Sequence, residues 1–280
     1  MPIKRIVIQP TLSQEEAERE FKGKYLDRSH YECRVSENMM GVLPDGEPKF
    51  VFLRSVIKPK DVNEFWLQLK TIKFKQAAHS RRPALRGGTG GEIALGWFNK
   101  PVPRRLAPTD EYVDQYIGLL PLVAYFKGAI QKYLPEYWEQ QVEVAKGNGH
   151  MRLWADLYEP GPALDKMLET IHKDNAELRA ALSPIFSTLT INKSAIFRSH
   201  ADAKNEGGLA CLAAFGRFIG GDLCLPRLRV AFNLKPGDIL ICDNNREQHG
   251  NIGPLTGTRI SVVCYLRAME KTKAAKGAMQ

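Results

Sequence analysis

The sequence predicts an α+β fold, in which a β-rich core built as a barrel or jelly roll is flanked by helices from the N-terminal half. Two observations carry this prediction. Helical patterns prevail in the first part of the chain, whereas from about residue 186 short apolar runs alternate with turn residues such as Pro236-Gly237-Asp238. Many short strands at this spacing are typical of two-layered or closed β folds.

The N-terminal part begins with a helix and a strand. Ser13 and Glu16 have the spacing of a capping box, which predicts a helix start. Residues 49–57 (KFVFLRSVI) are β-branched and aromatic and predict a strand. We expect Asp61 to cap a second helix. Its apolar face is formed by four residues, Phe65, Trp66, Leu69 and Ile72.

A longer helical region follows over residues 112–144, and Pro121 and Pro135 are expected to divide it into shorter helices. A further helix is predicted over residues 164–182. The predicted strands of the β-rich part cover residues 187–192, 209–215, 221–225, 230–234, 238–242 and 259–266.

Composition and charge limit the kind of protein. The chain has 280 residues, 44% of them hydrophobic, and its 40 Lys and Arg exceed its 31 Asp and Glu, giving a net charge of +9. This balance favours a polyanion such as nucleic acid as partner, although a merely basic protein is an equal alternative. The longest apolar run, residues 117–126, is too short to span a membrane. Residues 1–5 lack the apolar stretch of a signal peptide, and the expected location is intracellular, in the nucleus of a eukaryote or the cytoplasm of a phage host or bacterium.

The five cysteines do not form a metal-binding pattern. Their number is odd and no CxxC pair occurs. Four of them lie in apolar runs and are predicted to be small core residues in a reducing environment, namely Cys211, Cys224, Cys242 and Cys264.

The most informative motif is His200-Ala201-Asp202, followed by His249. Two imidazoles and one carboxylate form the facial triad that holds Fe(II) and leaves positions for a co-substrate and O₂. Side chains two residues apart on a strand share a face, so His200 and Asp202 can bind one ion. Zinc is the competing metal, but a structural zinc site more often uses cysteines.

Arg259 lies ten residues after His249, and Ser261 follows on the same face of the predicted strand. A guanidinium binds a carboxylate with two parallel hydrogen bonds, and the serine hydroxyl can donate a third. The dicarboxylate 2-oxoglutarate fits this pair, with its keto-acid end on the iron. The alternative is that Arg259 pairs with a structural Asp or Glu.

Other residues are candidates for substrate contact. Tyr265 and Arg267 continue the alternation of Arg259 and Ser261, although Tyr265 can equally be a core aromatic. Asn205, three residues after Asp202, can read a donor–acceptor edge with its amide. The basic, glycine-rich segment 81–91, which includes Arg86, suits phosphate contact, or it is a surface loop. Arg104 and Arg105 add further positive charge.

These motifs together resemble the TET/JBP family of nucleic-acid base oxygenases. The resemblance rests on His200-Ala201-Asp202-Ala203-Lys204-Asn205, on His249 49 residues after His200, and on Arg259. It also includes residues 220–226 and 235–238 and is specific over residues 186–267. It implies a double-stranded β-helix core and use of Fe(II), 2-oxoglutarate and O₂. A single domain is expected over residues 1–268, with a helix-rich flank (1–185), an iron-binding core (186–268) and a basic tail (269–280).

The resemblance also implies roles and a substrate. His200, Asp202 and His249 would bind iron and Arg259 would bind 2-oxoglutarate. Asn205 and Tyr265 occupy positions that contact a flipped base in the family, whereas Arg267 departs from the family's histidine. The expected function is oxidation of 5-methylcytosine in duplex DNA by a monomer. Thymine or N6-methyladenine, a protein or small-molecule substrate, and a non-catalytic jelly-roll DNA-binding module are the alternatives.

Overall fold

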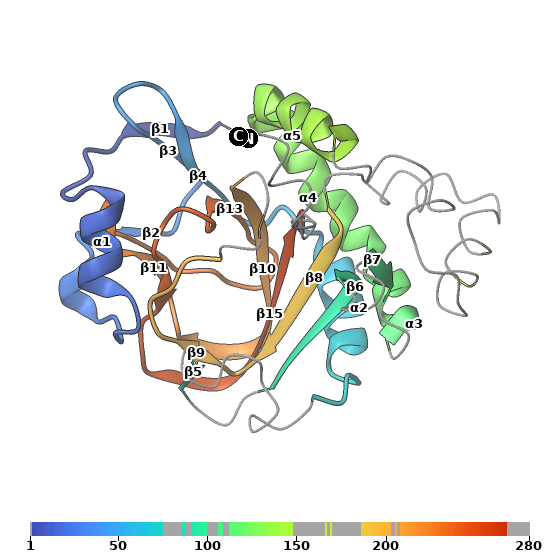
Figure 1. Cartoon of the computed structure of the whole chain (residues 1–280). Helices are drawn as coiled ribbons and strands as arrows, with labels where there is room; N and C mark the ends of the chain where they lie inside the picture. Colours follow the sequence, from blue (N-terminus) through green and yellow to red (C-terminus); the bar gives the residue numbers. More distant parts are fainter. Residues whose placement is uncertain are drawn as a thin grey trace. The chain divides into compact units, whose positions relative to one another are not determined.

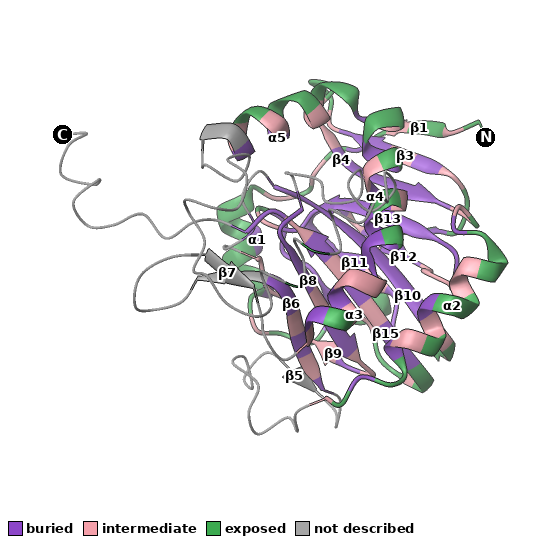
Figure 2. Cartoon of the chain, turned by 90° about the vertical axis from the view of Figure 1, so that its right-hand side faces the viewer, coloured by how far each residue is buried: buried purple, intermediate pink, exposed green. Residues whose placement is uncertain are grey.

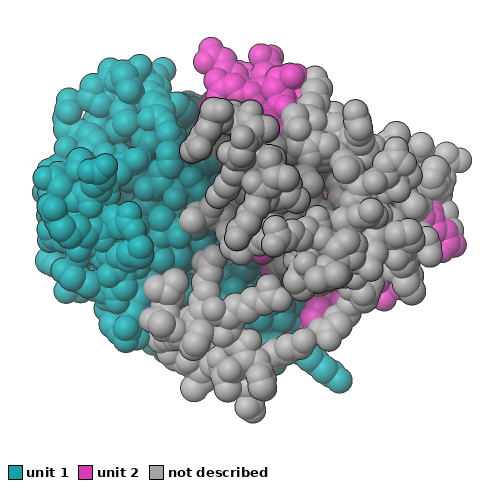
Figure 3. All heavy atoms as spheres, viewed as in Figure 1, with its two compact units in different colours: residues 1–93, 190–263 teal, residues 94–189, 264–280 magenta. Residues whose placement is uncertain are grey.

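The computed structural model describes residues 2–74, 86–87, 91–99, 106–108, 112–147, 166, 169, 186–202, 205 and 208–267 (Figure 1). The chain divides into two compact units. Unit 1 comprises residues 1–93 and 190–263, and unit 2 comprises residues 94–189 and 264–280 (Figure 3). The single domain over residues 1–268 stays a prediction.

Unit 1 contains most of the strands. Its helical elements are α1 (Gln14–Phe21), η1 (Arg28–His30), α2 (Pro59–Leu69) and η5 (Pro226–Leu228). Its strands are β1 (Lys4–Val7), β2 (Cys33–Val35), β3 (Met39–Val42), β4 (Pro48–Leu53), β5 (Arg86–Gly87), β9 (Ile196–Phe197), β10 (Leu209–Gly220), β11 (Leu223–Leu225), β12 (Val230–Phe232), β13 (Ile239–Asp243) and β14 (Gly250–Asn251). Three further strands run on into unit 2, namely β6 (Glu92–Asn99), β8 (Thr188–Lys193) and β15 (Leu255–Tyr265).

The strands of unit 1 form two main sheets. The larger sheet has the order β1-β3-β4-β13-β10-β15-β8-β6, and the smaller one has the order β14-β11-β12-β2. In the larger sheet β13 lies between β4 and β10, antiparallel to both. This central place fixes the end of β13, from which the segment leading to His249 departs.

The two sheets of unit 1 pack face to face. Phe232 of the smaller sheet lies with its ring centroid 4.8 Å from that of Phe50 and 6.1 Å from that of Phe52, both in the larger sheet. All three rings are almost fully buried, and β12 and β13 are buried along their whole length (Figure 2). Two sheets joined by an apolar interior are the architecture of a jelly roll. The predicted α+β class with a jelly-roll core is therefore confirmed.

Besides the ends of β6, β8 and β15, the described residues of unit 2 form β7 (Leu106–Pro108), α3 (Val113–Gly118), α4 (Leu120–Tyr133) and α5 (Pro135–Gly147). β7 pairs antiparallel with the end of β6. Pro121 lies in the first turn of α4 and Pro135 begins α5. The prediction that these prolines divide the helical region is confirmed, because proline fits the first turn of a helix but not its interior. Among the described residues, no helix is both long and apolar enough to cross a membrane.

Most predicted elements of the β-rich part are confirmed. The six predicted strands correspond to β8, β10, β11, β12, β13 and β15. The capping box of Ser13 and Glu16 is formed at the start of α1. None of the five cysteines, all of which the structure describes, forms a disulfide, and the four predicted core cysteines are buried.

Two details of the N-terminal part differ from the prediction. Asp61 does not cap α2, because the helix begins at Pro59 and places Asp61 in its first turn. The strands β1, β2 and β3 were not predicted. Each has only three or four residues, which is too short for a clear alternation of apolar and polar residues, and β1 is in addition largely exposed.

Several predicted features lie outside the described residues. They are most of the segment 81–91, Arg104 and Arg105, most of the helix over 164–182, and the tail 269–280. Of the segment 81–91 the backbone of Arg86 and Gly87 is described, and it pairs with Phe197 and Ile196 of β9.

Candidate active site

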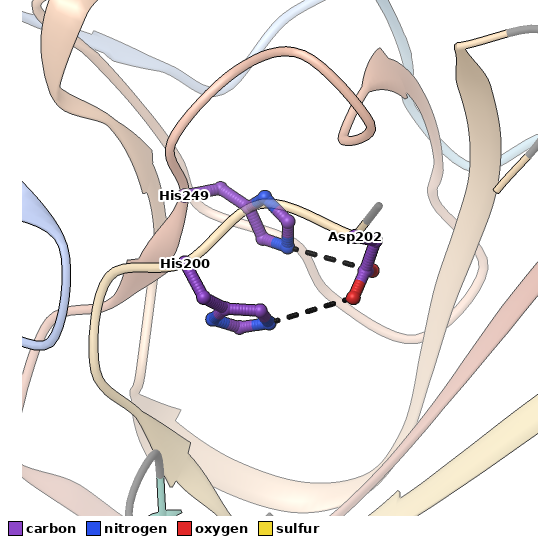
Figure 4. Close-up of side chains that lie close together, drawn as sticks. All are labelled: His200, Asp202 and His249. Atoms are coloured by element: carbon purple, nitrogen blue, oxygen red, sulfur yellow. Dashed lines mark ion pairs between the residues drawn. The ribbon is translucent and has the colours of Figure 1, made fainter. Parts of the chain in front are cut away.

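His200, Asp202 and His249 meet in unit 1. Their candidate ligand atoms all lie within 4.8 Å of one another. The Nε2 of His200 is 3.8 Å from Oδ1 of Asp202, and the Nε2 of His249 is 3.7 Å from Oδ2 (Figure 4). In the close-up the three side chains point toward one point between them. The structure thus brings together the three residues that the sequence predicts as metal ligands.

The backbone fixes the tautomer of both histidines. The Nδ1 of His200 lies 2.8 Å from the carbonyl oxygen of Arg198, and the Nδ1 of His249 lies 3.1 Å from that of Glu247. A carbonyl accepts a hydrogen bond, so Nδ1 carries the proton in each ring. The lone pair of each Nε2 then faces Asp202, which is the arrangement of metal-bound histidines.

Backbone hydrogen bonds join the segments that carry the ligands. His200 and His249 form an antiparallel bridge in which each N–H donates to the other's carbonyl, at 2.9 and 2.8 Å. The N–H of Asp202 donates to the carbonyl of Asn244 at 2.8 Å. Asp202 is therefore held against residues 243–249, the segment that ends in His249.

Side-chain amides fix the carboxylate ligand. The Nδ2 of Asn244 donates to Oδ2 of Asp202 at 2.9 Å, and the Nδ2 of Asn245 donates to the carbonyl of Asp202 at 3.0 Å. Asn244 and Asn245 were not among the site residues that the sequence predicted. Their signal was two consecutive amides directly after a buried strand and close before His249.

The residues fit Fe(II) better than a structural zinc ion. Two neutral imidazoles and one carboxylate leave coordination positions open, whereas structural zinc sites are closed and often use thiolates. Cys224 and Cys242 are fully buried, and neither belongs to the cluster of candidate ligand atoms. Within the described residues, His200, Asp202 and His249 form the one cluster of this kind.

Arg259 is buried and held by two backbone carbonyls. Its Nη2 donates to the carbonyl of Ala195 at 2.6 Å, and its Nη1 donates to the carbonyl of Gly221. Its Nε is buried without an acceptor, and no described carboxylate forms an ion pair with the guanidinium. The alternative of a structural ion pair is therefore not observed in the described part of the chain.

Burial lowers the pKa of Arg259 to about 10, against an opposing effect of Asp222. The guanidinium stays charged at neutral pH, and a buried cation without an ion pair favours an anion. Gly221 makes room for it, since a Cβ at this position would collide with the guanidinium. The backbone of Gly221 has a φ of +71°, which glycine adopts without strain.

The remaining predicted site residues have different outcomes. Ser261 is partly buried on the same strand as Arg259. Both amide hydrogens of Asn205 are engaged, by the carbonyl of Gly208 at 3.1 Å and by Oδ1 of Asn244 at 2.6 Å. Tyr265 and Arg267 belong to unit 2, where Nη1 of Arg267 donates to the Tyr265 hydroxyl at 3.2 Å. The side chain of Arg86 lies outside the described structure. Base contact by these residues stays a prediction.

Comparison with known proteins matches this site to a family. The model of the Tet_JBP family, described as the oxygenase domain of the 2OGFeDO superfamily, matches residues 99–268. A bifunctional helicase and thymine dioxygenase JBP2 from Trypanosoma brucei brucei is 35% identical over 134 residues, which cover 41% of this chain and 12% of that protein. The thymine dioxygenase JBP1 from the same organism is 27% identical over 229 residues, covering 76% and 24%.

A solved structure shares the fold. NgTET1 in complex with 5mC DNA aligns with a TM-score of 0.55 and 15% identity, covering 93% of this chain and 89% of that chain. At this identity the likeness concerns the fold alone. The curated relatives are much longer than the parts matched, since this chain spans 12% of JBP2 and 24% of JBP1.

The fold and the site define a 2-oxoglutarate- and Fe(II)-dependent dioxygenase. More particularly, the chain belongs to the Tet_JBP family, because the family model matches more than half of it. The predicted family, the enzyme class and the use of Fe(II), 2-oxoglutarate and O₂ are confirmed.

Proposed function

We propose that this protein oxidises the 5-methyl group of a pyrimidine base in DNA, with Fe(II) on His200, Asp202 and His249. The observation that carries the proposal is the convergence of these three donors within 4.8 Å in a chain of the Tet_JBP family. When bound together, Fe(II), 2-oxoglutarate and O₂ supply oxidation of a C–H bond, and 2-oxoglutarate becomes succinate and CO₂.

The protein's own residues bind and orient the reactants. The Nε2 lone pairs of His200 and His249 and the carboxylate of Asp202 hold the metal on one face, which leaves the other face open. Arg259 binds the far carboxylate of 2-oxoglutarate through its unused Nε–H, and Ser261 donates a further hydrogen bond from the same strand. This fixes the orientation of the co-substrate relative to the metal ligands.

DNA is the proposed partner for two reasons. The chain has a net charge of +9, which favours a polyanion. Its matched relatives are named thymine dioxygenases, and the matched structure is a complex with 5mC DNA. A methyl group inside a base stack cannot reach a buried metal, so the base must flip out of the duplex. Tyr265, Arg267, Asn205 and Arg86 are the residues we propose for contact with the base or its phosphates.

The proposed substrate class contains two natural bases, 5-methylcytosine and thymine. 5-Methylcytosine was predicted from the amide of Asn205 together with Tyr265. The engagement of both Asn205 amide hydrogens inside the protein weakens the support for that base, and the names of the relatives favour thymine. Both bases offer the same methyl group on the same ring position, so one experiment has to compare them.

Mass spectrometry of nucleosides tests the proposal. Two duplexes of identical sequence, one with cytosine and one with 5-methylcytosine at a single position, are incubated with the protein, Fe(II) and 2-oxoglutarate. Hydroxymethylcytosine from the second duplex or hydroxymethyluracil from both would support the proposal and identify the base. Succinate formation without any oxidised pyrimidine, in either duplex, would contradict it. The Asp202→Ala variant controls for oxidation by free iron.

A further inference from the structure

Four charged side chains are buried behind the segment that carries His249. Lys49 is 1% exposed, and Asp243 and Glu247 are not exposed at all. The Nζ of Lys49 lies 3.2 Å from Oδ2 of Asp243 and 3.7 Å from Oε1 of Glu247. The Nε of Arg227 donates to Oε2 of Glu247 at 2.7 Å, and its Nη2 donates to Oε1. We name Lys49, Arg227, Asp243 and Glu247 the buried ionic cluster.

The buried ionic cluster is electrically balanced but costly. Two cations face two carboxylates within the cluster, and the less buried pair of Arg246 and Glu47, 2.6 Å apart, adjoins it with one charge of each sign. No net charge is therefore buried. Moving these charges out of water nevertheless has a desolvation cost that can exceed the free energy of their mutual attraction. Replacing a buried ion pair with apolar residues of the same size therefore often makes a protein more stable. The best-attested role of a buried ion pair is to favour one conformation of the chain over others. The arrangement at stake here is that of residues 243–249.

The two carboxylates of the cluster stand within this segment, four residues apart. Asp243 is fixed by Lys49 and by Nε of Arg246, which donates to Oδ2 at 2.8 Å. Glu247 is fixed by the two-pronged contact of Arg227. Between the two lie Asn244 and Asn245, which hold Asp202.

Glu247, the second carboxylate of the cluster, also orients His249 through its backbone. The carbonyl of Glu247 accepts the hydrogen bond from Nδ1 of His249. Because Glu247 is held through its carboxylate, its carbonyl has a defined direction. The rotation of the His249 ring depends on that direction, and partners of this kind determine how well a site holds its metal.

We propose that the buried ionic cluster positions the iron ligands, by holding residues 243–249 so that Asn244 fixes Asp202 and the Glu247 carbonyl fixes His249. Lys49 and Arg227 are positioning residues and do not touch the metal. The inference rests on the proposed function only through the three metal ligands, and it is independent of the base that is oxidised.

A matched pair of substitutions tests this. Arg227→Lys keeps the charge but loses the two-pronged contact with Glu247. Arg229→Lys is the same change two residues away, in a pair with Glu32, whose side chain is 74% exposed. Binding of Co(II), as a stand-in for Fe(II), is measured by calorimetry together with the melting temperature of the metal-free protein. Arg227→Lys should weaken metal binding about tenfold, and Arg229→Lys should leave it unchanged.

A second variant acts nearer to the ligand. Asn244→Ala removes the hydrogen bond to Asp202 without disturbing a charge, and it should weaken metal binding by roughly 10–100-fold. Normal metal affinity in both Arg227→Lys and Asn244→Ala, with only a lower melting temperature, would make the cluster purely structural and overturn the inference. A wild-type protein that binds no Co(II), or that binds it equally well after His200→Ala, would instead refute the metal site itself.

Discussion

The two ends of the active site are built in different ways. At the iron end, each ligand is held by a second polar group, and residues 243–249 are fixed in turn by buried charges. At the arginine end, Arg259 is held by two backbone carbonyls, and its Nε has no partner within the described residues. Each ligand at the iron end thus has a polar partner, whereas at the arginine end one donor has none among the described residues.

This difference corresponds to what each end has to bind. A resident metal needs three donors in one fixed geometry, and fixing them beforehand lowers the cost of binding. A co-substrate that enters and leaves in every turnover needs a charged group that is oriented but not satisfied. The free Nε–H of Arg259 provides a strong hydrogen bond that forms only when a carboxylate arrives. Damage to the two ends should therefore have separable effects.

The largest effect is expected from loss of a metal ligand. His200→Ala removes one of three donors, and Fe(II) should no longer be held in an active geometry. Succinate formation from 2-oxoglutarate should fall below detection, at least about a thousandfold, since metal and co-substrate together carry the chemistry. His30→Ala, which changes a histidine on η1 paired with Asp27, serves as the control and should retain activity. Comparable succinate formation in both variants would remove His200 from the site.

The contrast between the two ends also explains what the sequence could predict. His200, Asp202, His249 and Arg259 were recognisable because their residue types and spacing follow from the chemistry of metal and carboxylate binding. Asn244 was not recognised as a partner of Asp202, because 42 residues separate them in the chain and only the fold brings them together. Lys49 was predicted to lie in a strand, but its complete burial depends on Asp243, 194 residues away.

The same reason limits the prediction of the fold. Long runs of apolar residues, as in β10 and β13, are evident from local pattern alone. β1 pairs with β3 through backbone hydrogen bonds at the edge of the larger sheet, and its side chains are mostly exposed. A strand that buries little leaves no hydrophobic period in its sequence.

The second prediction concerns the arginine end. Arg259→Lys keeps a positive charge but removes the planar guanidinium and with it the Nε–H that is proposed to bind the carboxylate. Loss of one charged hydrogen bond costs about 2 kcal/mol, so the KM for 2-oxoglutarate should rise roughly thirtyfold. Co(II) affinity should stay unchanged, because the iron end is held independently. Arg217→Lys, on an exposed part of β10, is the matched control. A loss of Co(II) affinity in Arg259→Lys as large as the rise in KM would show that the two ends are coupled.

A smaller effect is expected from Gly221→Ala. The added Cβ would collide with the guanidinium of Arg259 and displace it, so the KM for 2-oxoglutarate should rise about tenfold, for a loss of about 1.4 kcal/mol in binding. Gly23→Ala is a close control, since Gly23 has a φ of +78° but no atom within 4 Å of the added Cβ. Both variants should lose about 1–2 kcal/mol of stability from the positive φ. An unchanged KM in Gly221→Ala would mean that Arg259 does not need this space.

The smallest effect is expected for the reactivity of the buried cysteines, which reports whether the strand next to the iron end opens. Cys242 directly precedes Asp243 and is fully buried, as are Cys211, Cys224 and Cys264, whereas Cys33 is partly exposed. Burial raises the pKa of Cys224 to about 12 and those of Cys242 and Cys264 as well, so their reactive thiolate forms are scarce at neutral pH. A thiol reagent should modify Cys33 alone in the folded protein, as peptide mass spectrometry can show, and all five cysteines in denaturant.

Modification of Cys242 as fast as Cys33 would show that the strand leading to residues 243–249 opens readily. In that case the rigidity that distinguishes the iron end from the arginine end could not come from this part of the sheet.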